Sequence, residues 1–432
     1  MSLERLSSLR AALGPGSKTR ESSAFWVPGR IEVLGKHTDY AGGRSLVCAV
    51  EQGFVAVAVP RADTTVRVVN VAAGSEVTLA LDPALAHPAL AQPPEPWMRY
   101  PATVLRRVAR NFPAARRGAD LAFLSDLPLA SGMSSSSAFM VAVFLAIADI
   151  NRLSEDEAYR RTIGSPEDLA GYLATIENGQ SFGSLTGDRG VGTFGGSEDH
   201  TAMLCCRDGE LSQYSFCPVR HERQVRCPGD HRFVVAVSGV NAEKTGAAKD
   251  AYNRASLAVR AIHDAWRAAS GRLDASLAES VDRGGASSVR EVIERTPIDG
   301  FATQVLLNRF DQFVEESAHI IPAAAEALER RELARFGTLV DRSQDLAERQ
   351  LCNQVAETVS LARSARDLGA VAASAFGAGF GGSVWALVAD DDVPAFAARW
   401  EASYRAAFPA ASPAFLVTRP GPAAAKIPGS RI

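Results

Sequence analysis

A serine- and glycine-rich segment is one of the stretches in this chain whose residue types could do chemistry. Residues 127–138 read LPLASGMSSSSA and stand directly before a long apolar run. A turn of small residues at a helix N-terminus offers free backbone N–H groups and the positive end of the helix dipole, which suits phosphate groups. The hydroxyls of Ser134, Ser135 and Ser136, next to Gly132, could also bind magnesium. An ordinary serine-rich helix N-cap is the alternative interpretation.

A second segment carries charged side chains in a loop bounded by glycines. Residues 28–43 read PGRIEVLGKHTDYAGG. A carboxylate such as that of Asp39 can accept hydrogen bonds from two vicinal hydroxyls of a sugar. An arginine such as Arg30 can neutralise charge that develops on a transferred phosphoryl group. A solvated loop would explain any one of these charges but not the whole string, so the segment predicts a site for a sugar and for phosphoryl transfer.

Three segments, taken together, resemble a known family. Residues 127–138 resemble the second motif of the GHMP kinases, residues 28–43 resemble the signature of the galactokinases within that family, and residues 375–383, AFGAGFGGS, resemble the third motif. The chain is therefore identified as a galactokinase-like member of the GHMP small-molecule kinases. The resemblance implies a transferase of carbohydrate metabolism that uses ATP with Mg²⁺ and phosphorylates a monosaccharide, at the anomeric hydroxyl.

The resemblance also implies roles for single residues around the nucleotide. The triphosphate of ATP would rest on the turn from Gly132 to Ser136, and Trp97 would lie near the nucleotide. Ser136 and Glu177 would hold Mg²⁺. Arg30 would stabilise the transition state of the transfer.

Asp199 is the catalytic carboxylate that the resemblance implies. Residues 195–200 read GGSEDH and stand where the family has a short turn that leads to its catalytic aspartate. A carboxylate at this place can take or orient the proton of the sugar hydroxyl. Glu198 is a rival for the role, because the loop before it, residues 184–194, is longer than in the family. The other interpretation is that Glu177 and Asp199 are two surface acids without a function.

The sugar contacts implied by the resemblance are Lys36, His37, Asp39 and Tyr252. Two residues depart from the family, because Glu32 replaces an asparagine and Lys36 replaces a glutamate that approaches O6 of the sugar. An ammonium there suits a 6-carboxylate, so a uronic acid kinase for galacturonate or glucuronate is one alternative to a kinase for galactose or a related sugar. In the other interpretation Lys36 pairs with Glu32 or another acid and never meets the sugar.

Two glycine patterns suggest other nucleotide sites and are rejected. Residues 29–37 look like a Walker A loop, but the glycines are wrongly spaced and His37 replaces the required serine or threonine. Residues 377–382 match the dinucleotide fingerprint, which must open a helix. The apolar run 383–388 that follows predicts a strand instead.

The motifs require strands and helices to position them. Residues 138–150 are apolar nearly all round and predict a buried helix behind the serine-rich turn. The resemblance implies the two-domain α+β fold of the GHMP kinases, with the active site between the domains. The polar segment 217–230 suggests the boundary. We therefore expect an N-terminal domain over residues 1–225 and a C-terminal domain over residues 226–432.

The composition narrows the class of protein and its location. A net charge of −3 gives no reason to expect nucleic acid or a membrane surface as a partner. Six cysteines without a Cys-x-x-Cys pair indicate a reducing compartment. The N-terminus lacks an apolar leader, and no run approaches the ~20 apolar residues of a membrane span, so we expect a cytoplasmic protein. A catalytically idle sensor of sugar and ATP is the remaining alternative, although this chain retains both the phosphate loop and the acid that such relatives typically lose.

Overall fold

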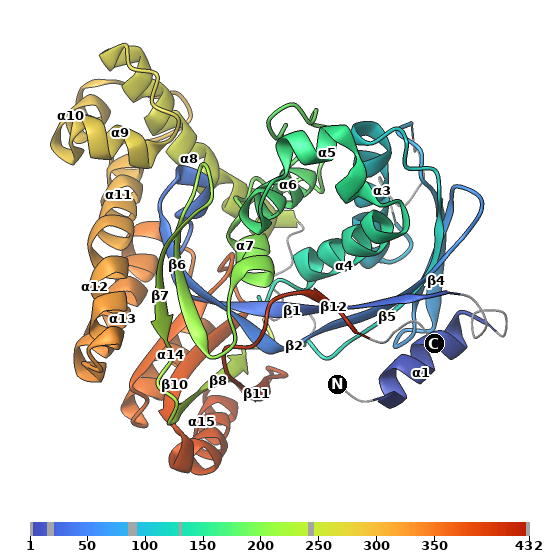
Figure 1. Cartoon of the computed structure of the whole chain (residues 1–432). Helices are drawn as coiled ribbons and strands as arrows, with labels where there is room; N and C mark the ends of the chain where they lie inside the picture. Colours follow the sequence, from blue (N-terminus) through green and yellow to red (C-terminus); the bar gives the residue numbers. More distant parts are fainter. Residues whose placement is uncertain (1–2, 15–20, 85–92, 129–131, 241–245, 429–432) are drawn as a thin grey trace.

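The computed structural model describes residues 3–14, 21–84, 93–128, 132–240 and 246–428. They build two β-sheets, each covered by helices (Figure 1). The sheets and helices are mixed along the chain, as expected for an α+β protein. Within these described ranges, no helix is both long enough and apolar enough to cross a membrane.

The larger sheet has eight strands, and its central path runs in the order β12-β1-β2-β5-β3-β4. All pairs are antiparallel except β3 with β5, and β6 extends the sheet from the start of β2, with β7 beside it. Strand β2 is rich in valine and buried along most of its length, which favours a strand covered on both faces. The strands are β1 (Ser23–Leu34), β2 (Arg44–Pro60), β3 (Thr65–Asn70), β4 (Ser75–Ala80), β5 (Ala119–Ser125), β6 (Glu210–Ser215), β7 (Arg220–Arg226) and β12 (Ala425–Lys426).

One face of the larger sheet carries most of the helices of the N-terminal half (Figure 1), whereas α1 (Leu3–Ala12) packs on the other face, against β2 and β5. The helices on the first face are α3 (Arg99–Asn111), α4 (Ser135–Ile150), α5 (Glu157–Thr162), α6 (Pro166–Asn178) and α7 (Glu198–Cys205). Short turns of 3-10 helix connect them or flank the sheet: η2 (Asp39–Ala41), η3 (Pro96–Met98) and η4 (Leu153–Glu155).

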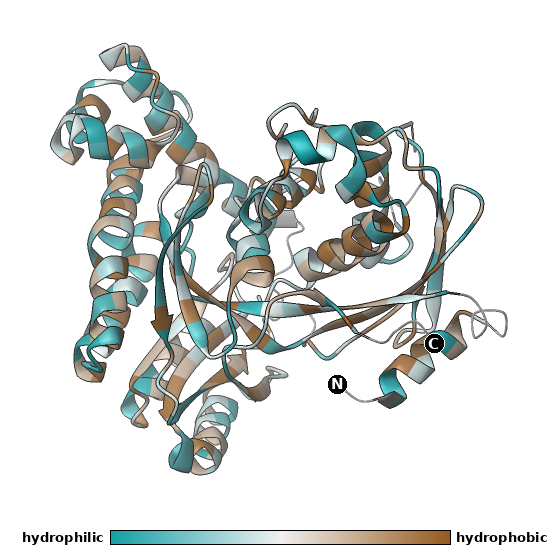
Figure 2. Ribbon diagram, viewed as in Figure 1, coloured by the Kyte–Doolittle hydropathy of each residue, from teal (hydrophilic) through white to brown (hydrophobic). Residues whose placement is uncertain are grey.

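Helix α4 lies in the core behind the serine-rich turn. It packs on β1 and β2 and against α3, so it is covered on nearly every side. Figure 2 shows α4 almost uniformly brown, whereas α5 at the surface is largely teal. The predicted buried helix is therefore confirmed, and its burial fixes the position of the turn that begins it.

The C-terminal half contains a second sheet of four antiparallel strands in the order β11-β8-β10-β9 and a large helical part. The strands are β8 (His231–Val237), β9 (Ala372–Phe376), β10 (Ser383–Ala389) and β11 (Ala414–Thr418). The helices are α8 (Gly246–Ser270), α9 (Leu277–Gly284), α10 (Ala286–Arg295), α11 (Thr303–Val314), α12 (Ile321–Glu329), α13 (Leu333–Leu346), α14 (Ala356–Asp367) and α15 (Val393–Ala407), with π-helical turns η5 (Glu315–Ile320) and η6 (Ala347–Leu351) and the 3-10 turn η7 (Asp390–Asp392).

Two details bear on the predictions from sequence. The run after the glycines of residues 377–382 is strand β10, so the rejection of a dinucleotide fingerprint there is confirmed. The polar segment 217–230 is not a plain linker, because it contains β7, which pairs with β6 over its whole length. The division at residues 225/226 stays a prediction, and β12 near the C-terminus returns to pair with β1.

Candidate active site

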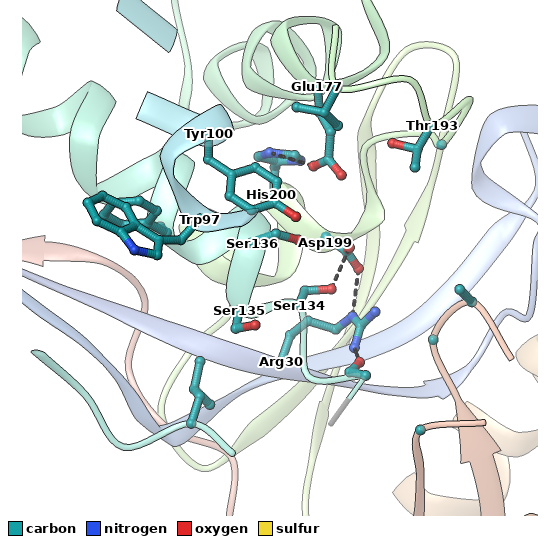
Figure 3. A pocket seen from close by; sticks show the side chains of 18 of the residues that line it. Arg30, Trp97, Tyr100, Ser134, Ser135, Ser136, Glu177, Thr193, Asp199 and His200 are labelled. Atoms are coloured by element: carbon teal, nitrogen blue, oxygen red, sulfur yellow. Dashed lines mark hydrogen bonds and ion pairs between the residues drawn. The ribbon is translucent and has the colours of Figure 1, made fainter. Parts of the chain in front are cut away.

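A cavity of about 950 Å³ lies where segments from both halves of the chain meet. Its walls include side chains of β1 and of the first turns of α4 and α7. The C-terminal end of α6, Tyr252 of α8 and the glycine loop after β9 complete them. Figure 3 shows the phosphate-loop serines, Arg30 and Asp199 gathered at one place in it. Of the residues predicted for the site from the sequence, all line this cavity except Lys36.

Arg30 and Asp199 form the central contact of the cavity. The Nε atom of Arg30 donates to Oδ1 of Asp199 over 2.7 Å, and the Ser134 hydroxyl donates to Oδ2 of the same carboxylate over 2.5 Å. A second guanidinium nitrogen donates to the carbonyl oxygen of Gly132. Burial alone would lower the pKa of Arg30, but the nearby carboxylates, Asp199 foremost, raise it above its usual value. The arginine is therefore a fixed cation between residues 28–43, here called the sugar loop, and residues 127–138, here called the phosphate loop.

The phosphate loop enters α4 through a left-handed residue. Ser134 has φ 57° and ψ 44°, and its carbonyl accepts the first helical bond, from the N–H of Ala138. Gly132 also has a positive φ, of 70°. The side chains of Ser135 and Ser136 line the cavity at the N-terminus of this 16-residue helix, where backbone N–H groups are unpaired within the helix. Part of the loop, residues 129–131, lies outside the described residues.

Glu177 is positioned near the same helix start. It is buried near the end of α6, and the Ser137 hydroxyl donates to its Oε2 over 2.8 Å. His200 lies 3.8 Å from the same oxygen. Both Glu177 and Ser136 line the cavity (Figure 3). Among the residues that the structure describes, no group of three or more His, Cys, Asp or Glu could hold a metal by itself. One carboxylate and one hydroxyl fit a magnesium ion that takes its other ligands from phosphates and water.

His37 and Tyr252 form an aromatic wall next to Asp39. Their ring centroids lie 5.0 Å apart. Nε2 of His37 lies 3.0 Å from the carbonyl oxygen of Ala378, which can only accept, so Nε2 carries the proton. Nδ1 therefore accepts from the Tyr40 hydroxyl, over 2.9 Å. Burial lowers the pKa of His37 to about 4, so the ring is neutral and both nitrogens are already bonded within the protein.

Asp39 is a buried carboxylate at this end of the cavity. Its Oδ1 accepts from the N–H of Tyr40 over 2.8 Å, and its Oδ2 accepts from the N–H of Glu198 over 3.1 Å. The pKa of Asp39 is raised to about 6, mainly by burial and also by the charge of Asp199, while the two backbone bonds and Arg30 oppose the shift. Each oxygen keeps a lone pair for a further donor.

Glu198 and Asp199 contact different partners, which helps to decide which of the two is the catalytic carboxylate. The Ser45 hydroxyl donates to Oε2 of Glu198, and Arg30 approaches that side chain only to 3.9 Å. Burial raises the pKa of Glu198 well above its usual value. The Asp199 side chain is 19% exposed, against 6% for Glu198, and takes the short contact from Arg30. The geometry favours Asp199 as the carboxylate that meets a substrate.

Lys36 lies outside the cavity, contrary to the expectation that it contacts the sugar. The residue is only 1% exposed, and its ammonium donates to the hydroxyls of Ser374, over 2.7 Å, and Ser343, over 3.1 Å. Ser343 in turn donates to Glu316, which also accepts from the N–H of Gly35. The alternative, a direct pairing with Glu32, is not seen among the described residues, because the ammonium donates to these two hydroxyls instead, although its charge still acts on Glu32. Lys36 thus ties the sugar loop to α13 and β9.

The long loop of residues 184–194 is fixed on both sides. Arg106 of α3 donates to Asp188, and Asn253 of α8 donates to the carbonyl of Gly192 and accepts from the N–H of Phe194. Thr193, between these last two, lines the cavity (Figure 3). The loop therefore closes one wall of the cavity and joins it to α8.

Several phenylalanine residues and Trp97 line the cavity, and of these only Trp97 was predicted for the site from the sequence. An apolar wall of Phe54, Phe123, Phe139 and Trp97 lies at the other end, with ring centroids 4.3–6.0 Å apart. The Trp97 indole N–H donates to Glu95 over 2.7 Å. Aromatic residues on strands and helices usually belong to a core, so only the fold could show that these face a cavity. Trp97, expected near the nucleotide, is among them.

Three family models and several known proteins match this chain. The galactokinase galactose-binding signature matches residues 16–60, the N-terminal domain of GHMP kinases matches residues 99–186 and their C-terminal domain matches residues 324–406. The galactokinase of Chloroflexus aurantiacus is 30% identical over 380 residues, covering 86% of this chain and 85% of that protein. The galactokinase of Chloroflexus aggregans is 29% identical over 386 residues, covering 87% and 86%.

A solved structure gives the same fold. The crystal structure of Lactococcus lactis galactokinase complexed with galactose matches with a TM-score of 0.77, covering 98% of this chain and 100% of that one, at 22% sequence identity. The order of the two sheets and their helices is therefore that of a known architecture.

Proposed function

This chain belongs to the galactokinase family of the GHMP kinases, and we propose that it transfers the γ-phosphoryl group of ATP to the anomeric hydroxyl of galactose. Its α+β fold is the GHMP kinase fold predicted from the sequence, and its class is that of a sugar kinase. One observation carries the proposal: Arg30, Asp199 and Ser134 are bonded to one another, so the sugar loop, the carboxylate and the phosphate loop meet at one point.

The proposed chemistry follows from these contacts. Asp199 accepts or orients the proton of the attacking hydroxyl, because it is the more exposed of the two adjacent acids. Arg30 faces the charge that develops on the transferred group, and its bonds to Asp199 and to the Gly132 carbonyl hold it in place before the substrates arrive. Such pre-positioning supplies most of the catalysis in phosphoryl transfer.

The nucleotide would occupy the part of the cavity between the apolar wall and α4. Gly132, Ser134 and Ser135 would surround the phosphates, and the aromatic rings near Trp97 would cover the base. Ser136 and Glu177 would hold Mg²⁺, which when bound supplies neutralising charge to the phosphate oxygens.

The sugar would occupy the end formed by Asp39, His37 and Tyr252. Asp39 supplies acceptor lone pairs for sugar hydroxyls, and the neutral His37 ring packs edge-on against Tyr40 and at a tilt against Tyr252. Because both His37 nitrogens are bonded within the protein, we propose that His37 shapes this end of the cavity and positions the sugar by contact.

The alternatives from sequence are not favoured. A uronic acid kinase would need Lys36 in the cavity, and its ammonium is bound to two serines elsewhere. An idle sensor would not need the intact contact between Arg30 and Asp199. A cytoplasmic location and the absence of a nucleic-acid partner stay predictions.

A coupled assay of ADP formation with a panel of monosaccharides tests the proposal. Galactose should give the highest kcat/KM, and turnover should require magnesium. A panel in which galacturonate outperforms galactose, or in which no sugar stimulates ADP release, would contradict it. The Asp199→Asn variant serves as the inactive control in the same assay.

A further inference from the structure

Glu32 is a buried acid that the chemistry described so far does not use. It stands two residues after Arg30 on β1, so the two side chains lie on the same face of the strand. Both line the cavity. Glu32 is 4% exposed, and its Oε2 accepts from the N–H of Gly377 over 3.3 Å. Its other oxygen, Oε1, is buried and has no hydrogen-bond partner among the described residues.

An unpartnered buried oxygen is costly and calls for an explanation. Buried polar groups are nearly always hydrogen-bonded, because leaving one unpaired forfeits its bonds to water. Burial raises the pKa of Glu32 to about 7, although the positive charges of Arg30 and Lys36 oppose the shift. Oε1 of Glu32 therefore lacks a hydrogen-bond donor, and the residue lines a cavity that would receive a substrate.

The neighbours of Glu32 indicate what that donor is. The charges of Arg30 and Asp199 act on Glu32 from the cavity, and those of Lys36 and Glu316 act on it from residues that do not line the cavity. Its partner Gly377 adjoins Ala378, which binds His37. Glu32 thus belongs to the sugar end of the cavity and not to the aromatic end. Together with Asp39, Glu198 and Asp199 it makes four carboxyl groups around Arg30. Such an end repels an anionic substrate and offers acceptors to a neutral one that carries hydroxyls.

We propose that Glu32 is a sugar-specificity residue, whose free oxygen Oε1 accepts a hydrogen bond from one hydroxyl of a neutral monosaccharide. The inference rests on the proposed function and adds to it, because it assigns a further contact and excludes acidic sugars.

The test compares variants against sugars that lack one hydroxyl each. We would measure the Kd of galactose and of its 2-, 3-, 4- and 6-deoxy analogues by calorimetry, for the parent chain and for Glu32→Met, which removes both oxygens at similar volume. The expected loss is about ten- to a hundredfold for galactose. The same loss should appear with three analogues and vanish with the one analogue that lacks the hydroxyl bound by Glu32.

Two further variants keep the result interpretable. Glu316→Met is the matched control, because Glu316 is equally buried and also has an unpartnered oxygen, but does not line the cavity. It should show no dependence on which hydroxyl is missing. Glu32→Gln keeps the length of the side chain and an acceptor for Gly377, so it replaces the Met variant if that one does not fold, with the same pattern at about three- to tenfold.

The outcomes separate this inference from the proposed function. Equal affinity of Glu32→Met and the parent for every sugar would overturn the inference, and so would the same loss for all five sugars. Calorimetry reads binding without turnover, so it decides about Glu32 even if the parent transfers no phosphoryl group to galactose. That last result would contradict the proposed function alone.

Discussion

The Nε atom of Arg30 lies 2.7 Å from Oδ1 of Asp199, although the two residues are 169 positions apart in the chain. The contact joins β1 to the first turn of α7, and the Ser134 hydroxyl completes it from the start of α4. The three side chains therefore form one hydrogen-bonded cluster that joins three separate elements. Substituting one residue at a time separates the contributions of the residues in and around this cluster.

The first prediction separates Asp199 from its neighbour. Asp199→Asn should lower kcat by about a hundred- to ten-thousandfold, because the amide cannot take a proton, while the Kd for ATP changes little. Glu198→Gln, at an adjacent and more buried acid, should retain most of the turnover. Single-turnover kinetics and nucleotide binding measure the two effects. A larger loss in Glu198→Gln would move the catalytic role to Glu198.

The second prediction concerns the metal. Ser136→Ala removes a hydroxyl that we place on Mg²⁺, so half-saturation by magnesium should rise by about tenfold at fixed ATP. Ser135→Ala, one residue earlier on the same helix start, is the matched control and should change the magnesium requirement less. Magnesium titrations of kcat give the comparison. Identical curves for Ser136→Ala and the parent would remove Ser136 from the metal site.

The third prediction is a pH dependence of sugar binding. Asp39 accepts from hydroxyls best when ionised, and its pKa is about 6, above its ordinary value. Its ionised fraction therefore falls about tenfold from pH 7 to pH 5, and the KM for sugar should rise by a similar factor. His37, with a pKa lowered to about 4, stays neutral over this range. Glu32, with a pKa of about 7, takes up its proton at a higher pH than Asp39 does as the pH falls.

Two variants assign the steps in that profile. Asp39→Asn should remove the step near pH 6, and Glu32→Gln should remove any step near pH 7. Initial rates over pH 5–8 in a constant-ionic-strength buffer provide the profile. A KM that stays flat from pH 7 to pH 5 in the parent would show that the ionised Asp39 does not bind the sugar.

The sequence was sufficient for the motifs and much of the framework, because both depend on local patterns. The serine-rich turn before an apolar helix and the strand after residues 377–382 follow from spacing and composition, and the structure has both. The side on which Lys36 lies could not be predicted. Its direction depends on Ser343 and Ser374, more than 300 residues away, which receive the ammonium.

The same limit applies to Glu32. From the sequence it was one unusual acid that could pair with Lys36, and its place in the cavity depends on Gly377 from the other half of the chain. The aromatic wall near Trp97 likewise combines β2, β5 and α4, whose side chains would each suit an ordinary core. Contacts between distant segments fixed these residues, and no local pattern records such contacts.

The fourth prediction follows from the buried position of Lys36. Lys36→Met should leave the ratio of kcat/KM for galactose and galacturonate within about threefold, but should destabilise the fold, because it removes a cation near the buried acids Glu32 and Glu316. Lys36→Glu would place a carboxylate near Glu316 and should cost about 3–5 kcal/mol of unfolding free energy. Chemical denaturation and the two-sugar assay check both. A selective gain or loss for galacturonate in Lys36→Met would return Lys36 to the substrate site.

The most direct measurement of the central claim is the identity of the product. The parent chain would be incubated with magnesium, ATP and galactose, and the phosphorylated sugar identified by phosphorus and proton NMR. We predict a sugar phosphorylated at the anomeric carbon, formed in equal amount to ADP, and its absence with Asp199→Asn. Phosphorylation at another hydroxyl, or ADP release without a phosphorylated sugar, would contradict the account.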